Sequence, residues 1–128
     1  MTPSLDILDR LICFDTVSHR SNIGLIDYVE DYLRAHNFRL HRIRDSKQDK
    51  AGLYAEIGPQ IEGGILLSAH SDVVPVDQQV WSKPPFQLTR EGDRLFGRGT
   101  TDMKGFLSEM LALADRAQNM TVRAPLKL

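Results

Sequence analysis

Apolar residues recur with helical spacing in three stretches of the chain. The first, residues 3–14, follows Thr2 and Pro3, a hydroxyl that can cap a helix and a proline that is tolerated at the first helical position. A second amphipathic stretch covers residues 22–36, and Asn37 suits its C-terminal end. The third runs from Met103 to Ala114, with apolar residues spaced for one helix face. The pattern therefore predicts three helices.

Between the second and third of these helices the period changes to two. Residues 38–43 and 53–57 alternate apolar and polar side chains, which predicts two strands, and the apolar run 65–69 predicts a strand buried on both faces of a sheet. Residues 86–97 indicate a hairpin with Glu91, Gly92 and Asp93 at its tip. Residues 121–128 read as a loop and the opening of another strand. Helices before, between and after strands predict an α/β fold, with a mixed sheet flanked by helices.

Charge and composition argue against one class of partner, nucleic acids. Of the 128 residues, 41% are hydrophobic, and 16 Lys and Arg residues face 17 Asp and Glu residues, which gives a net charge of −1. This balance argues against a nucleic-acid partner, because such binding depends on excess positive charge. The basic residues within 39–44 alternate with apolar ones and indicate the solvent-facing side of an edge strand.

No signal peptide or membrane span is indicated. The N-terminus carries acidic residues where a signal peptide needs basic ones, and no apolar run approaches about 18 residues. Cys13 is the only cysteine, so no intrachain disulfide can form, and its apolar helical surroundings predict a buried structural thiol. We expect one cytoplasmic domain without a membrane partner.

Two polar residues follow the apolar run 65–69 directly. In an extended chain His70 and Asp72 project to the same side, at the end of the strand where open α/β sheets place their ligands. An imidazole with a neighbouring carboxylate is typical of a metal ligand and the group that orients it. The alternative is a structural His–Asp hydrogen bond that closes a loop.

A glycine-rich stretch, G-R-G-T-T-D-M-K-G at residues 97–105, precedes the third helix. It differs from the dinucleotide fingerprint, because Asp102 stands where that motif has a glycine and would repel a pyrophosphate. Asp102 directly precedes the helix, so it can serve as an N-cap or as a metal ligand. The three glycines indicate a tightly bent backbone that aims one side chain.

Taken together, H-S-D-V-V-P at 70–75, Trp81, Pro84-Pro85-Phe86 and the stretch 97–105 resemble the co-catalytic zinc hydrolases. This family includes acetylornithine deacetylase, succinyl-diaminopimelate desuccinylase, aminoacylase and glutamate carboxypeptidase. The amino-acid sequence of residues 70–106 is most similar to the acetylornithine deacetylase branch. The resemblance implies the three-layer phosphorylase/hydrolase-like zinc peptidase fold. Residues 1–128 would be the N-terminal portion of its di-zinc catalytic domain.

The resemblance also implies roles for individual residues. His70 would bind one metal, Asp102 would bridge two metals, and Asp72 would orient His70 as part of the catalytic machinery. The peptide bond between Asp102 and Met103 would be cis. The cofactor would be two Zn²⁺ ions, with Co²⁺ possible, and the reaction would be hydrolysis of the amide of a small N-acyl amino acid, within arginine biosynthesis if the acetylornithine branch applies. A homodimer is implied for the full-length protein.

The chain departs from the family pattern after Asp102. Family members carry a downstream Glu-Glu pair, a further acidic ligand, a late His and a dimerisation domain. In this chain the later acidic residues are Glu109 and Asp115, and neither has an adjacent acid. We therefore expect the 128-residue chain to bind zinc weakly and to lack deacylase activity by itself.

Two other function classes remain open at this stage. One is a binding module that keeps the fold without the catalytic site, and the other, disfavoured by Asp102, is a nucleotide-binding protein. Trp81 and Phe86 are expected to pin a loop over the end of the sheet, with substrate contact as the alternative. Arg98 could contact carboxylates of the site or of a substrate. Lys104, a cation at a helix start, suggests a nearby carboxylate partner.

Overall fold

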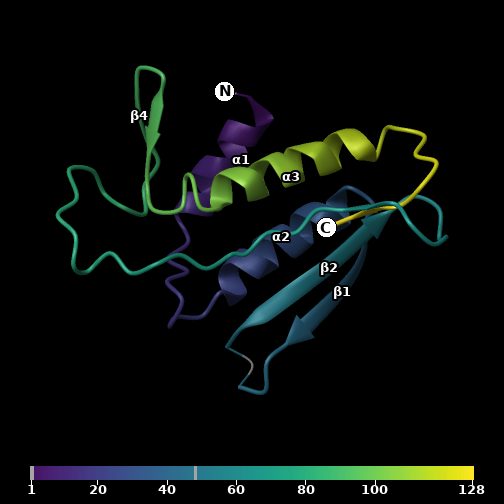
Figure 1. The fold of residues 1–128 in the computed structure, drawn as a ribbon, viewed down its shortest axis with the longest axis horizontal. Helices are drawn as coiled ribbons and strands as arrows, with labels where there is room; N and C mark the ends of the chain where they lie inside the picture. Colours follow the sequence, from purple (N-terminus) through teal and green to yellow (C-terminus); the bar gives the residue numbers. More distant parts are fainter. Residues whose placement is uncertain (1, 48) are drawn as a thin grey trace.

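The structure is a computed structural model that describes residues 2–47 and 49–128. Within these residues three helices and six strands follow one another, and Figure 1 shows how the main elements are arranged. Their bounds are α1 Pro3–Ile12, α2 Ile23–Ala35, β1 Arg39–Arg44, β2 Ala51–Ile57, β3 Ile65–Leu66, β4 Thr89–Glu91, β5 Arg94–Phe96, α3 Lys104–Ala117 and β6 Leu126–Lys127. The predicted α/β class and the three helices are confirmed, with ends that differ by a few residues.

The main sheet is mixed and has the strand order β1-β2-β6-β3. Strand β2 pairs antiparallel with β1 along six residue pairs and with β6 along two. Strand β3 runs parallel to β6, with Ile65 opposite Leu126 and Leu66 opposite Lys127. The strand expected to open within residues 121–128 is β6, which lies inside the sheet between two strands that come from the middle of the chain. A separate hairpin is formed by β4 and β5 around Gly92, whose φ is 60°.

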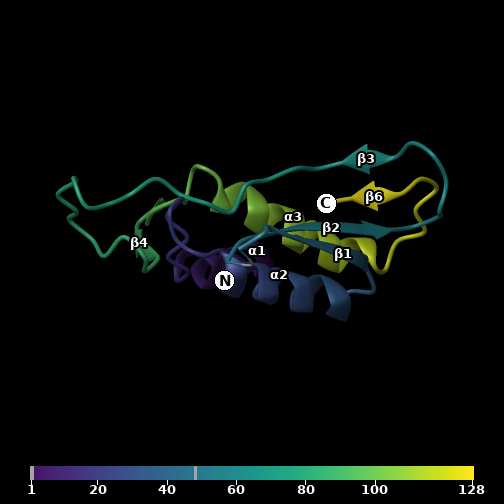
Figure 2. The same cartoon turned by 90° about the horizontal axis from the view of Figure 1, so that it is seen from below.

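The helices gather on one side of strands β3 and β6 (Figure 2). Their apolar faces meet in one core with the inner residues of β2, because the helical spacing of these side chains puts them on one stripe. Helix α1 packs mainly against α3, and α2 packs against β1, β2 and α3. The core consists of Ile7, Leu11, Leu25, Ile26, Val29, Leu33, Phe38, Ala51, Ala55, Leu107, Leu111, Ala114 and Ala117.

Beyond β3 the chain runs away from the sheet as one extended segment. It passes the start of α3 and reaches the β4–β5 hairpin at the opposite end of the molecule (Figures 1 and 2). Residues 67–70 belong to this segment and follow β3 without a strand assignment. This path carries the residues after β3 to the turn that precedes α3.

Three expectations about local structure are wrong. The run 65–69 is predicted to be a strand buried on both faces, but the strand covers only Ile65–Leu66, and these residues are 65% and 62% exposed, because among the described strands only β6 pairs with β3. Thr2 occupies the N-cap of α1 without a side-chain cap hydrogen bond. Cys13 is exposed, since it lies at the C-cap of α1 just beyond the buried face, and its thiol donates to the carbonyl of Asp9.

The basic residues of 39–44 lie on β1, an edge strand of the described sheet, as predicted, but Arg42 is only 17% exposed and faces α2 rather than solvent. Arg39 pairs with Glu56 on β2, and Arg42 pairs with Asp27 and Glu30 on α2. These charges therefore tie the edge strand to its neighbours. In the described part of the chain, no helix is long and apolar enough to cross a membrane.

Candidate metal centre

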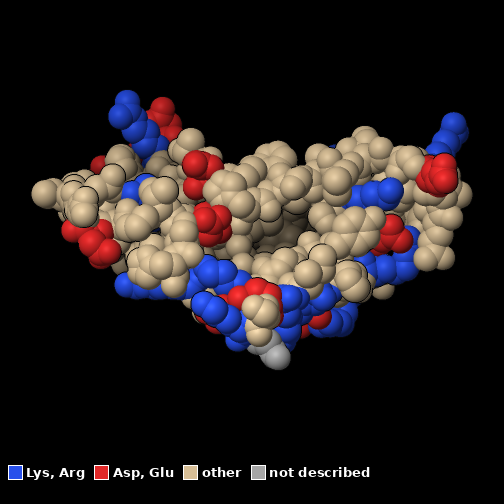
Figure 3. Space-filling model, turned by 60° about the horizontal axis from the view of Figure 1, so that its bottom comes forward, with Lys and Arg blue, Asp and Glu red and all other residues tan. Residues whose placement is uncertain are grey.

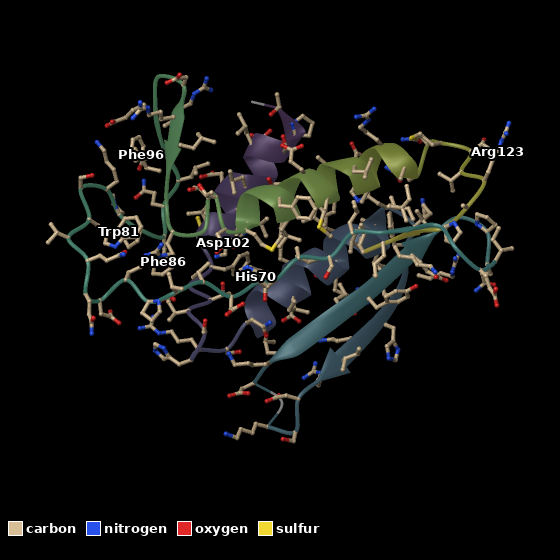
Figure 4. All side chains as sticks on the ribbon, viewed as in Figure 1. His70, Trp81, Phe86, Phe96, Asp102 and Arg123 are labelled. Carbon is tan, nitrogen blue, oxygen red and sulfur yellow. The ribbon has the colours of Figure 1, made fainter. Side chains whose placement is uncertain are left out.

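His70 and Asp102 meet at the end of the extended segment that follows β3. Nε2 of His70 lies 2.9 Å from Oδ1 of Asp102, although 32 residues separate them in the sequence. His70 comes from the extended segment and Asp102 from the turn before α3, as Figure 4 shows. The backbone N–H of His70 also donates to Sδ of Met103, which holds the segment against the first residues of the helix. The predicted convergence of the two side chains is confirmed.

The other ring nitrogen of His70 faces Asp72. Nδ1 is 3.0 Å from the backbone carbonyl oxygen of Asp72 and 3.2 Å from its Oδ1. With acceptors on this side, Nδ1 is the nitrogen that carries the proton when Nε2 is used as a ligand. The geometry is the one expected of a residue that orients His70, a role for Asp72 that stays a prediction.

The charges around the ring alter two pKa values. Burial by itself lowers the pKa of His70, but the hydrogen bonds to Asp102 and to the Asp72 carbonyl outweigh it, and the pKa of His70 is raised. The hydroxyl of Ser18 donates to Oδ2 of Asp72 over 2.6 Å and is the main reason that the pKa of Asp72 is lowered. Asp72 is thus held as a carboxylate next to a ring that favours a positive charge.

The turn 97–105 directs the side chain of Asp102 away from the start of α3 and toward His70. Gly99 has a φ of 87°, and a Cβ there would lie 2.8 Å from Cγ1 of Val73. The peptide bond between Asp102 and Met103 is cis, as the resemblance implied. The N-cap of α3 is Met103, and it makes no side-chain cap hydrogen bond. The capping role considered for Asp102 is therefore wrong, and its carboxylate is directed to His70 instead.

The burial of Lys104 was not predicted from the sequence. It is fully buried, and its Nζ donates to the backbone carbonyl of Phe14 over 2.6 Å. Burial lowers the pKa of Lys104 to about 8, although the nearby charge of Asp15 opposes that change. The sequence suggested a carboxylate partner for this cation, but a backbone carbonyl accepts its hydrogen bond, and the Asp15 carboxylate acts only through its nearby charge. Lys104 thereby ties the start of α3 to the loop after α1.

Trp81 and Phe86 lie on the loop side of the site (Figure 4), and Arg98 contacts Trp81 there. The guanidinium of Arg98 lies over the ring of Trp81, 4.9 Å from its centroid, and contacts the side chain of Gln79. Trp81 and Phe86 are both partly buried. These contacts fit the expectation that Trp81 pins the loop, and they engage Arg98 with the loop through a cation–π contact.

Two cavities adjoin the His70–Asp102 pair. A cavity of about 210 Å³ is lined by His70, Asp72, Asp102 and the turn residues 97–101, so it brings the ionisable groups to solvent. A larger groove of about 720 Å³ runs between β2 and residues 66–72, over apolar residues of α2 and α3, and reaches His70 only at one end. A hollow surrounded by uncharged side chains is visible in Figure 3. We place the chemistry at the smaller cavity, because it holds both His70 and Asp102.

The donor types at this cavity fit a zinc ion. An imidazole nitrogen and a carboxylate oxygen are both ordinary zinc ligands, and here they converge on one point. A catalytic zinc site takes at least three protein ligands. Within residues 2–47 and 49–128, no group of three or more His, Cys, Asp or Glu residues is placed to hold a metal. The described residues thus bring together two side chains, His70 and Asp102, of types that can bind zinc.

Fold and site together define an α/β domain with a histidine and a carboxylate converging beside a polar cavity. Residues 66–128, which contain both side chains, match the model of peptidase family M20/M25/M40. The chain is 36% identical to an acetylornithine deacetylase of Buchnera aphidicola, over 84% of this chain and 29% of the relative. It is 34% identical to an acetylornithine deacetylase of Pasteurella multocida, over 97% of this chain and 34% of the relative. The chain belongs to the M20/M25/M40 family.

Two solved structures share the fold. An M20 family metallo-carboxypeptidase from Sulfolobus solfataricus superposes with a TM-score of 0.83 and 25% identity, covering 100% of this chain and 30% of that one. Human carnosine dipeptidase 1 gives a TM-score of 0.78 at 22% identity, covering 97% of this chain and 30% of that one. The chain spans about a third of the length of the curated relatives it matches.

Proposed function

We propose that this chain belongs to a metal-dependent hydrolase that removes the acyl group from an N-acyl amino acid. The preferred reaction is N²-acetyl-L-ornithine plus water giving L-ornithine plus acetate. The named relatives support this choice, because those quoted above are acetylornithine deacetylases. Succinyl-diaminopimelate desuccinylase and related aminoacylases or carboxypeptidases are the alternatives within the family. The cytoplasmic location and the dimer expected from the sequence stay predictions.

The observation that carries the proposal is the 2.9 Å approach of His70 Nε2 to Asp102 Oδ1. In this proposal His70 would hold one Zn²⁺ ion, and the Asp102 carboxylate would be shared between two. Asp72 keeps the His70 ring oriented and its proton on Nδ1. When bound, the zinc ions would polarise the acyl carbonyl and lower the pKa of water toward about 7. The reaction breaks the amide C–N bond, forms a C–O bond and passes a proton to the leaving amine.

Two ligands do not complete such a site, so we propose that this chain by itself binds zinc weakly and has no deacylase activity. The same two-ligand arrangement favours a second candidate, a binding module that keeps the fold without catalysis. Coding DNA that continues past Leu128 into an apolar strand and a Glu-Glu pair would favour the enzyme. A natural stop codon after Leu128 would favour the binding module.

The test is a Zn²⁺ titration of the chain beside the His70→Ala and Asp102→Ala variants. Both substitutions should weaken Zn²⁺ binding by more than the roughly tenfold that loss of a group behind a ligand costs, because each removes one of the two proposed ligands. Glu109→Ala is the matched control, since it removes a carboxylate from α3 outside the cavity. Unchanged zinc binding in both site variants would refute the metal assignment. Full-rate turnover of N²-acetyl-L-ornithine by the 128-residue chain would refute the expected inactivity.

A further inference from the structure

We propose that Ser18 is a positioning residue for the metal site, acting on His70 through Asp72. The inference rests on the proposed function, in which His70 binds zinc. Ser18 lies in the loop between α1 and α2, far from His70 in the sequence, and no motif marks it. Its hydroxyl nevertheless makes a 2.6 Å hydrogen bond to Asp72.

The contact divides the Asp72 carboxylate between two partners. Oδ2 accepts the hydrogen bond of the Ser18 hydroxyl, and Oδ1 lies 3.2 Å from Nδ1 of His70. The terminal torsion of an aspartate is broad, so the carboxylate can rotate freely unless something holds it. With one oxygen tied to Ser18, the other is turned to the histidine ring.

Packing alone does not hold this carboxylate. The side chain of Asp72 is 50% exposed and that of His70 is 47% exposed, so solvent reaches both groups. Hydrogen bonds must therefore supply the orientation. A hydroxyl donating to a carboxylate is a charge-assisted bond, which is stronger than a neutral one.

Ser18 itself is fixed by the backbone. Its N–H donates to the carbonyl of Val73, and the N–H of Val73 donates to the carbonyl of Thr16, each over 3.0 Å. Val17 and Val73 form a parallel bridge, and both are buried. Nζ of Lys50 donates to the carbonyl of Ser18 over 2.5 Å. The hydroxyl thus starts from a position set by neighbours on both sides.

The test uses the 128-residue chain with Ser18→Ala, Ser18→Thr and Ser21→Ala variants. Ser18→Ala removes the hydroxyl, and Ser18→Thr keeps one. Ser21→Ala is the matched control, because Ser21 lies in the same loop and its hydroxyl accepts from the N–H of Ile23. Zn²⁺ affinity is measured by titration, and the ¹⁵N shifts of the His70 ring report which nitrogen carries the proton in the zinc-loaded chain.

Ser18→Ala should weaken Zn²⁺ binding about tenfold, the usual lower end for loss of a group behind a ligand. Its His70 ring should show a mixture of forms where the original chain shows one form with the proton on Nδ1. Ser18→Thr should restore both readouts, and Ser21→Ala should leave both unchanged. Ser18→Ala should unfold at a somewhat lower urea concentration than Ser21→Ala, because it loses the charge-assisted hydrogen bond to Asp72, so Zn²⁺ affinity is measured without urea, where both variants are folded.

The inference is overturned if Ser18→Ala binds Zn²⁺ as the original chain does, or if Ser21→Ala weakens binding equally. It is also overturned if Ser18→Thr fails to restore the ring signature. His70→Ala, measured in parallel, separates this failure from that of the proposed function. Weaker binding in His70→Ala beside unchanged binding in Ser18→Ala removes Ser18 alone, whereas no effect of His70→Ala removes both proposals.

Discussion

The buried Lys104 predicts a specific dependence of stability on pH. Its side chain is fully buried, and burial lowers its pKa from 10.5 to about 8 in the folded chain. Between these two values the unfolded chain binds more protons than the folded chain, so the free energy of unfolding rises with pH. This gain is complete above about pH 10.5 and is lost as the pH falls through about 8.

The size of the effect follows from the difference between the two pKa values. One pKa unit corresponds to about 1.4 kcal/mol, so this lysine changes the free energy of unfolding by about 3 kcal/mol across the window. Lys104→Met keeps a long unbranched side chain at this position and removes the titrating amino group. The variant should lack this contribution, although it also loses the hydrogen bond to the Phe14 carbonyl.

The assay is urea unfolding of the original chain and of Lys104→Met at several values of pH between 7 and 10.5. The quantity of interest is the difference between the two free energies of unfolding, because the titration of tyrosines common to both chains cancels in it. That difference should move by about 3 kcal/mol in favour of the original chain as the pH rises. Lys47→Met, which removes an exposed lysine, controls for the loss of one positive charge. A difference that stays flat across the window would refute the reasoning.

Three further substitutions test the packing that positions the site. Gly99→Ala should cost about 1–3 kcal/mol and weaken Zn²⁺ binding, because the residue has a positive φ and its new Cβ would meet Val73; urea unfolding and zinc titration check this. Leu111→Ala should cost about 2–5 kcal/mol in urea unfolding, since Leu111 is 1% exposed in the core. Asn22→Ala should cost about 2 kcal/mol by the same assay, because the amide of Asn22 pairs with both backbone groups of Ala51. A loss below about 0.5 kcal/mol in any of the three would contradict its assignment.

Local pattern accounts for most of the secondary structure. The helical spacing of apolar residues located α1, α2 and α3, and the period of two located β1 and β2. The unbroken apolar run was misleading at Ile65 and Leu66, because their burial depends on which strands lie beside β3, and local pattern carries no such information. Of the strands that the structure describes, the short β6 alone pairs with β3.

The site was only partly within reach of sequence reasoning. Spacing of two residues placed His70 and Asp72 together, but the approach of Asp102 depends on a turn and a chain path that only the resemblance indicated. The burial of Lys104 was missed, because a lysine at a helix start is ordinarily solvated and no periodic pattern marks a long-range contact to a carbonyl. Ser18 was missed for the same reason, as loop hydroxyls carry no periodic signal.

The groove beside β2 has a consequence for how the chain behaves at high concentration. Within the described residues, β2 pairs on this side only as far as Ala55, and residues 67–70 run alongside without a second partner strand. Part of the backbone on each side of this apolar groove therefore has no neighbouring strand within the described residues, although Asn22 pairs with Ala51 and Met103 accepts from the N–H of His70. An extended polypeptide, including a second copy of this chain, can add as a strand to such an edge. Aggregation at high concentration should therefore begin at this groove.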